Sequence, residues 1–441
     1  MKLYPHQERT LNETVGFSNI GIFHDMGLGK TYTGSEAMLR FNTDINLIIC
    51  QKSKVQDWVD HFKTVYGFTE VFDLTKPKEL QDFFLHVGYY NMIGIINYEL
   101  AWRRKQLLQL SDFTLMLDES SLIQNPKAKQ TKFVLQLHPS HVILLSGTPV
   151  GGKYENLWSQ CKLLGWKITE HAFQNTYVNW TKIETCGFVT KIVDKDDPYK
   201  NVDRLKSKLR EHGAIFLKTE EVMDLPDQVF QKILVDKSTE YKKFQKNHVV
   251  QIKTTKPFCE YEPDSDFFGK DVTPTIELTG DTTLTKILYS RQLCGQYSLE
   301  KIEAVRDLIQ STQDRLIIFY NFDAELEALK KICKDRPVSE INGHDKDLVA
   351  YEQESNSITL VQYQAGSKGL NLQKCNRIIY FTLPLSSEHF EQSKKRIHRI
   401  GQENPCFYYL PIVKNSIEEH ILETLEQRKD YTDELFEELD S

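Results

Sequence analysis

Two arginines near the end of the chain, Arg396 and Arg399, have the type and spacing needed to act together on a phosphate. Residues three apart lie on one face of a helix, so the spacing predicts that both guanidinium groups point the same way. A guanidinium fork binds phosphate oxygens through paired hydrogen bonds, and two forks can stabilise the charge that develops during phosphoryl transfer. The pair therefore indicates phosphoryl-transfer chemistry.

A glycine-rich segment over residues 24–31 follows the apolar run 20–23 and resembles a phosphate-binding loop. Gly27 and Gly29 let backbone N–H groups close around a phosphate, Lys30 adds a positive charge, and Thr31 can ligate magnesium. The strict pattern begins with glycine, whereas this chain has His24. The segment predicts a site for ATP with magnesium; the alternative is a plain glycine turn at the end of a strand.

An acidic pair, Asp118 and Glu119, comes directly after the apolar run 113–117. At the end of a buried strand, Asp118 can hold magnesium while Glu119 orients or deprotonates the attacking water. A helix N-terminus favoured by the helix dipole is the alternative explanation of such a pair. The order of strand, phosphate loop, strand and acidic pair favours ATP hydrolysis.

Two further segments could serve the same site. Residues 145–149 end the next apolar run, and their small hydroxyl side chains could sense the γ-phosphate, although a strand-to-loop turn would have the same composition. Gln7 could bond both N6 and N7 of adenine through its side-chain amide. On its own, a glutamine here is more often a surface residue.

Short apolar runs recur between polar stretches of helical pattern, which predicts buried parallel strands in an α/β fold. We expect an N-terminal lobe over 1–165, a helical protrusion with a loop over 166–284, and a C-terminal lobe over 285–441. Prolines, glycines and acidic residues predict a loop or hairpin at 253–282, and apolar residues at helical spacing predict a bracing helix at 416–425.

Composition fits a globular protein, with 40% hydrophobic and 27% charged residues among 441. A net charge of −7 leaves room for a local basic groove but not for wrapping nucleic acid over the whole surface. The eight cysteines form no Cys-x-x-Cys pair, which predicts reduced thiols rather than a zinc site or disulfides. We find no apolar run of membrane-spanning length and no signal peptide, so we expect a cytoplasmic protein.

Together these motifs resemble helicase superfamily two, and more closely its Swi/Snf-type family of double-stranded-DNA translocases. The resemblance rests on residues 3–7, 25–31, 118–125, 145–149, 364–373 and 396–402, together with Ser53 and Trp58. It implies two RecA-like lobes with parallel sheets, with ATP held between them. By this resemblance Arg396 and Arg399 are arginine fingers, and Gln392 and Gly369 belong to the nucleotide site.

The resemblance also implies a groove that tracks the phosphate backbone of duplex DNA without reading bases. Its candidate contacts are Lys52, Ser53, Lys54, Ser367 and Lys368, with residues 97–99 after the fourth strand. The cluster 102–105 is a further basic candidate, although a charged run on a helix is more often a solvated face. We recognise no nuclease, zinc or histone-reading module, so we expect a monomer with a separate targeting protein in a bacterial or bacteriophage-infected cell.

Three positions depart from the family pattern. Ser120 and Ser121 replace the small residue and histidine that complete the acidic motif, which could alter the coupling of hydrolysis to movement. His24 and Asp25 stand where an Asp-Glu pair is common, and residues 383–385 replace Trp-Asn-Pro. A strand-separating DNA or RNA helicase, with 253–282 as its wedge, and a DNA-binding scaffold that does not hydrolyse ATP remain the alternatives.

Overall fold

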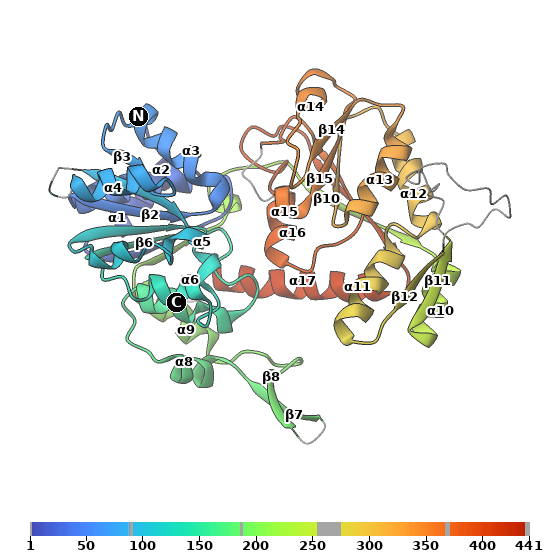
Figure 1. Cartoon of the computed structure of the whole chain (residues 1–441), viewed down its shortest axis with the longest axis horizontal. Helices are drawn as coiled ribbons and strands as arrows, with labels where there is room; N and C mark the ends of the chain where they lie inside the picture. Colours follow the sequence, from blue (N-terminus) through green and yellow to red (C-terminus); the bar gives the residue numbers. More distant parts are fainter. Residues whose placement is uncertain are drawn as a thin grey trace, which may run out of the picture. The chain divides into compact units, whose positions relative to one another are not determined.

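The computed structural model describes residues 2–86, 88, 91–185, 188–253, 275–366 and 371–436. It divides into two compact units (Figure 1). The first unit comprises Met1–Leu225 with Glu426–Ser441, and the second comprises Pro226–Leu425. Among the described residues, no helix is long and apolar enough to cross a membrane.

The first unit is built on a parallel sheet with the strand order β3-β4-β2-β5-β6-β1-β9. In that order its strands are Val71–Asp73, Met92–Asn97, Ile45–Cys50, Phe113–Asp118, His141–Leu145, Asn19–His24 and Ala214–Leu217. The central strands are buried on both faces, which explains why they appear in the sequence as continuous apolar runs.

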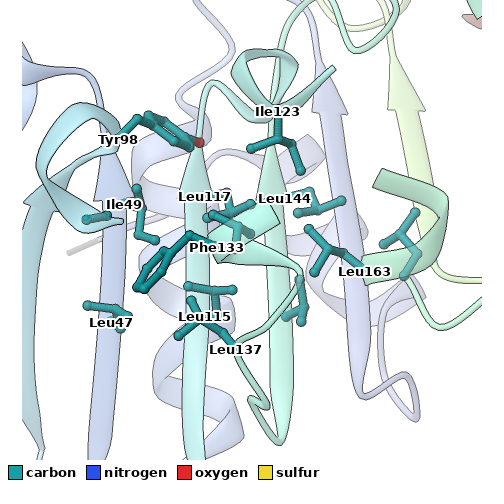
Figure 2. Packing of buried hydrophobic residues seen from close by; sticks show 14 of the residues in the cluster. Leu47, Ile49, Tyr98, Leu115, Leu117, Ile123, Phe133, Leu137, Leu144 and Leu163 are labelled. Atoms are coloured by element: carbon teal, nitrogen blue, oxygen red, sulfur yellow. The ribbon is translucent and has the colours of Figure 1, made fainter. Parts of the chain in front are cut away.

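Side chains of this sheet alternate between two apolar clusters. Leu47 and Leu115 face one cluster, in which α5 (Tyr98–Ala101), α6 (Lys129–Val134), α7 (Trp158–Leu163) and α9 (Val202–Glu211) bury residues. Ile48 and Met116 face the other, with α1 (Pro5–Glu13), α2 (Lys30–Phe41) and α3 (Val55–Asp60). Figure 2 shows the first cluster, where Leu117 and Leu144 lie on neighbouring strands. Helices therefore cover both faces of the sheet.

The second unit has its own parallel sheet, in the order β10-β17-β16-β13-β15-β14. These strands are Gln228–Val235, Cys406–Val413, Arg377–Tyr380, Leu316–Tyr320, Ile358–Gln362 and Val338–Ile341. Ile317 and Phe319 face one apolar cluster, and Leu316 and Ile318 face another. The predicted α/β fold class, with a parallel sheet in each of two lobes, is confirmed.

The predicted bracing helix is present as α17 (Ile417–Phe436). Ile421, Leu422 and Leu425 lie in a core cluster of the second unit. Its Glu418 carboxylate forms a buried ion pair with Lys301 of α12 (Leu299–Gln310), at an Nζ–Oε1 distance of 2.5 Å. This pair holds two helices of the second unit together.

The middle of the chain differs from a purely helical protrusion. It contains the helices α8 (Glu170–Tyr177), α10 (Thr239–Asn247) and α11 (Thr283–Cys294). It also contains two antiparallel strand pairs, β7 (Trp180–Thr185) with β8 (Phe188–Val193) and β11 (Val249–Lys253) with β12 (Thr275–Thr279). It also supplies an edge strand to each large sheet, β9 and β10. β10 is exposed along most of its length, so its polar residues hide its strand character from an apolar pattern. Most of the predicted 253–282 loop lies outside the described residues.

Candidate active site

Three predicted segments meet at one edge of the first sheet because they follow neighbouring parallel strands. The register pairs Asp118 of β5 with Leu145 of β6, and Leu145 with Ile22 of β1. The phosphate loop follows β1, the acidic pair ends β5, and the 145–149 segment ends β6. Carboxyl ends of parallel strands are the usual place for ligands in α/β sheets.

The phosphate loop turns tightly through two glycines and then begins a helix. Gly27 and Gly29 have φ angles of 93° and 72°, a region that favours glycine. The Lys30 ammonium donates to the carbonyl oxygens of His24 at 2.8 Å and Asp25 at 3.1 Å. Lys30 is also the first residue of α2, whose free N–H groups and dipole favour an anion. This arrangement suits a phosphate group.

Side chains from α1 hold the loop in this shape. The Gln7 amide donates through Nε2 to the Gly29 carbonyl at 3.1 Å, and its Oε1 accepts from the Tyr4 backbone N–H at 2.9 Å. His6 Nε2 lies 3.0 Å from the Leu28 carbonyl oxygen. Gln7 is therefore buried against the loop, with both ends of its amide already bonded.

His24 replaces the first glycine without straining the backbone, since it is the last residue of β1. Its ring is fully buried, with Nε2 placed 3.0 Å from the Thr10 hydroxyl. Burial lowers the pKa of His24 to about 3, and the nearby positive charge of Lys30 contributes. A neutral imidazole at this position adds no charge beneath the loop at ordinary pH.

The acidic pair lies at a sharp bend. Asp118 Oδ2 accepts a hydrogen bond of 2.9 Å from the Trp58 indole N–H, and the Tyr98 hydroxyl donates to the Asp118 carbonyl oxygen at 3.0 Å. Burial raises the pKa of Asp118, while the Trp58 bond and the charge of Lys30 oppose that rise. Glu119 adopts a left-handed φ of 54°, which is uncommon for a side chain of this size. Because of this bend, the side chains of Asp118 and Glu119 point in different directions.

The segment after β6 lies against the phosphate loop. A Cβ atom added to Gly147 would lie 3.0 Å from Met26 Cγ and 3.3 Å from Lys30 Nζ. Ser146 is buried, and its hydroxyl accepts from the Thr148 backbone N–H at 3.1 Å. A residue without a side chain at 147 therefore allows this segment to pack closely on Lys30. Thr31, the other predicted magnesium ligand, is half-buried in the first turn of α2.

The predicted DNA contacts have different surroundings. Lys52 and Ser53 are exposed in a short 3-10 helix after β2, while the Lys54 ammonium pairs with the Asp57 carboxylate at 2.7 Å. Within the candidate segment 97–99, the Tyr98 side chain is buried and its hydroxyl bonds to the Asp118 carbonyl oxygen, so this side chain does not lie on the surface. Ser367, Lys368 and Gly369 lie outside the described residues.

The two arginines belong to the second unit, and the prediction that they share a helical face is wrong. Helix α16 (Ser387–Lys394) ends before them, and both lie in the turns that follow. Arg396 is buried and Arg399 is half-buried. Burial lowers the pKa of Arg399, and its buried Nε donates no hydrogen bond within the described part of the chain. Gln392, on α16, is buried and donates to Glu388 at 3.0 Å.

Gln402 fixes the turn that carries the arginines, a role that the sequence alone did not suggest. Its Nε2 lies 3.1 Å, 3.0 Å and 3.3 Å from the carbonyl oxygens of Gln373, Cys375 and Ile397. Gly401 precedes it with a φ of 91°. One amide therefore ties the arginine segment to the chain just before β16. The only sequence signal was its place directly after the glycine of the motif.

Comparison with known proteins identifies the family. Residues 8–298 match the SNF2-related domain, and residues 300–401 match the helicase conserved C-terminal domain. The first match alone covers more than half of the chain. The chain belongs to the SNF2-related family. The enzyme class expected from the sequence, a DNA-dependent ATPase of helicase superfamily two, is confirmed.

Relatives of this SNF2-related chain come from bacteria and animals. It is 23% identical to the ATP-dependent helicase YqhH of Bacillus subtilis, over 99% of this chain and 80% of YqhH. It is also 23% identical to the putative ATP-dependent helicase/translocase YwqA of Bacillus subtilis, covering 99% of this chain and 49% of YwqA. A mouse SWI/SNF-related regulator of chromatin is 23% identical, over 96% of this chain and 42% of its own. The chain thus spans less than half the length of the latter two.

A solved structure is also similar. The SWI2/SNF2 ATPase core of Sulfolobus solfataricus in complex with double-stranded DNA is 18% identical, with a TM-score of 0.45. The alignment covers 98% of this chain and 92% of that core.

Proposed function

We propose that this SNF2-related ATPase moves along double-stranded DNA without separating the strands, and thereby remodels DNA or protein–DNA complexes. The observation that carries the proposal is the convergence of Lys30, Asp118 and Gly147 at one edge of the first sheet, in a chain of this family. Such a site binds a triphosphate and positions an attacking water. Hydrolysis of the triphosphate then supplies the free energy for movement.

Each residue of the first unit has a distinct role in this proposal. Backbone N–H groups at Gly27 and Gly29 cradle the phosphates, and Lys30 exchanges its two carbonyl acceptors for phosphate oxygens. Glu119 orients the attacking water. Gln7 contacts adenine through the second N–H and the second lone pair of its amide, while it keeps its bonds to Gly29 and Tyr4.

Thr31 and Asp118 are the residues that would hold magnesium. Both offer hard oxygen donors, and the Trp58 hydrogen bond favours the ionised form of Asp118 that a cation requires. Magnesium is commonly held by one or two such side chains together with the phosphates of the substrate. When bound, it neutralises charge on the β- and γ-phosphates.

The second unit supplies further positive charge for the same reaction in our proposal. Arg396 and Arg399 stabilise the phosphoryl group as it leaves ADP, and the buried Nε of Arg399 is a donor that phosphate could satisfy. Gln392 and Gly369 complete the nucleotide contacts. Removing an arginine finger lowers turnover far more than it lowers nucleotide affinity.

In our proposal, residues that contact DNA phosphates bind the ATPase to duplex DNA. Lys52, Ser53 and Lys54, with Ser367 and Lys368, contact the backbone of double-stranded DNA, as the exposure of Lys52 and Ser53 allows. A net charge of −7 restricts such contacts to a local groove. We propose a monomeric motor that a separate protein directs to its targets.

Displacement of a third DNA strand tests the proposal directly. With ATP, the protein should remove a triplex-forming oligonucleotide from a blunt duplex and leave the duplex intact. The Lys30→Ala variant is the control for dependence on hydrolysis. Separation of the duplex strands, especially from a substrate with a single-stranded tail, would instead establish a strand-separating helicase. Failure to hydrolyse ATP with any nucleic acid would indicate a scaffold.

A further inference from the structure

A pair of buried hydrogen bonds joins the acidic loop to the segment that lies on the phosphate loop. The Ser120 hydroxyl donates to Gln160 Oε1 at 2.8 Å, and Gln160 Nε2 donates to the Pro149 carbonyl oxygen at 2.7 Å. Ser120 follows Glu119 directly, Pro149 ends the 145–149 segment, and Gln160 lies on α7. The side chains of Ser120 and Gln160 have no solvent exposure.

The chemistry of the three groups sets the direction of both bonds. The Pro149 carbonyl can only accept, so the amide nitrogen of Gln160 must face it and the amide oxygen must face Ser120. That oxygen in turn requires Ser120 to donate its hydroxyl proton. The orientation of Gln160 is therefore fixed at both ends.

A second amide strengthens the same junction. Gln124 Nε2 donates to the Pro149 carbonyl oxygen at 3.4 Å, and Asn156 Nδ2 donates to Gln124 Oε1 at 3.1 Å. Gln124 comes directly after the short helix Ser120–Ile123, on the same loop as the acidic pair. Gln124 of the acidic loop and Gln160 of α7 thus both donate to the Pro149 carbonyl oxygen.

Stability alone does not explain a polar bridge in this place. Ile123, on the same short helix as Ser120, and Leu163, on α7 with Gln160, belong to the apolar cluster that Figure 2 shows. An apolar side chain at 160 would bury well there, whereas a buried amide is tolerated only while its hydrogen bonds are made. What the bridge adds is a defined geometry between two loops whose other connections are the longer Gln124–Pro149 hydrogen bond and the strand pairing that ends at Asp118 and Leu145.

We propose that Gln160 is a positioning residue for ATP hydrolysis, which makes the acidic pair and the 146–149 segment move as one body. The inference rests on the proposed function, since it assumes that Asp118 and Glu119 act on ATP. Segment 146–149 packs on Lys30, so the bridge transmits a displacement at the phosphate loop to the carboxylates. Breaking it should slow the chemical step and leave ATP binding intact.

The test compares Gln160→Leu, Ser120→Ala and the double variant with the unchanged protein. Each single variant leaves a buried polar group unsatisfied, so we expect lower melting temperatures and duplex-stimulated kcat values reduced by about tenfold, with KM for ATP changed less than about twofold. The double variant removes the polar groups of Ser120 and Gln160, and the Pro149 carbonyl oxygen that remains still accepts from Gln124, so most of the stability should return. Its kcat should remain low, because the two loops are still uncoupled.

Ser159→Ala is the matched control, because Ser159 is buried on the same helix and its hydroxyl has no hydrogen-bond partner among the described residues. It should match the unchanged protein in kcat and KM. Recovery of kcat together with stability in the double variant would show that Gln160 is merely structural. A normal kcat in Gln160→Leu would overturn the inference outright.

Amide hydrogen exchange separates this inference from the proposed function. In Gln160→Leu, residues 119–123 and 146–150 should lose protection together, whether or not the protein is stimulated by duplex DNA. Loss of protection in only one segment would contradict mechanical coupling. If the unchanged protein shows no duplex-stimulated turnover, the proposed function fails, and exchange alone decides the coupling.

Discussion

The two units place their phosphate-directed cations by different means. In the first, Lys30 follows directly from a strand and starts a helix, so the register of a parallel sheet fixes its position. In the second, Arg396 and Arg399 lie in turns beyond the end of α16, and the side-chain amide of Gln402 holds those turns. Backbone pairing is shared among many hydrogen bonds, whereas a single side chain can be removed by one substitution.

This difference separates residues that perform chemistry from residues that hold others in place. In the first unit, a substitution of Lys30 or Asp118 removes the reacting group while the sheet edge remains. In the second, a substitution of Gln402 leaves both arginines present but loosens the segment that carries them, which keeps backbone bonds such as that from the Leu372 N–H to the Arg396 carbonyl oxygen. The following predictions test the contrast, from the largest effect to the smallest.

Lys30→Ala should abolish ATP hydrolysis, with turnover falling by about a thousandfold or more, because the variant lacks the charge that faces the phosphates. The fold should persist, since the bonds from the Lys30 ammonium to the His24 and Asp25 carbonyl oxygens lie within its own loop. Steady-state hydrolysis and thermal unfolding check both statements. Near-normal hydrolysis would mean that the phosphate site lies elsewhere.

Arg399→Ala should retain ATP binding and lose turnover by roughly a thousandfold, as expected of an arginine finger. Arg399→Lys should recover only part of the loss, because an ammonium cannot reproduce the bidentate fork. Nucleotide titration together with single-turnover hydrolysis distinguishes the two effects. Equal turnover in both variants and the unchanged protein would remove Arg399 from the catalytic set.

Gln402→Leu should lower kcat by roughly tenfold, because small displacements of a catalytic group reduce the rate without removing it. Gln402→Glu is the informative companion: it keeps the size of the side chain but cannot donate to the Gln373, Cys375 and Ile397 carbonyls. Both variants should therefore be slow. Full activity in Gln402→Glu would show that the amide donor does not position the arginines.

Glu325→Gln should change stability with pH and affect hydrolysis little. Glu325 is buried in the second unit, and burial raises its pKa to about 7 from its usual 4.5. An unfolded chain therefore releases this proton at lower pH than the folded one, so the unit loses stability as pH rises through that window, by at most about 3 kcal/mol. The Gln variant, which can still accept the bonds from Asn321 and Phe322, should lack that slope. Chemical denaturation at several pH values between 5 and 8 gives the free energy of unfolding of each protein. The same dependence on pH in the Gln variant and the unchanged protein would mean that Glu325 ionises normally.

Much of the first unit could be predicted from sequence because its information is local. Buried parallel strands appear as apolar runs, and the phosphate loop and acidic pair are contiguous motifs beside them. Edge strand β10 was missed because Gln231 and Lys232 interrupt its apolar residues, and β9 was missed because its apolar run is only four residues long in a charged stretch. The end of α16 was missed because no glycine or proline intervenes before Gly401.

The contacts that tune the site could not be predicted, because they join residues far apart in the chain. Trp58 reaches Asp118 across 60 positions, and Gln160 reaches Ser120 across 40. No spacing rule connects such pairs; only the packing of α3 and α7 on the sheet does. The same holds for Gln402, whose acceptors follow from how the second sheet is connected.

The most direct test of the account is steady-state ATP hydrolysis by the unchanged protein, without nucleic acid and with duplex DNA, single-stranded DNA or RNA. We expect strong stimulation by duplex alone, which weakens as salt screens the phosphate contacts. Stimulation mainly by single strands or RNA would contradict the duplex translocase and favour a strand-separating helicase.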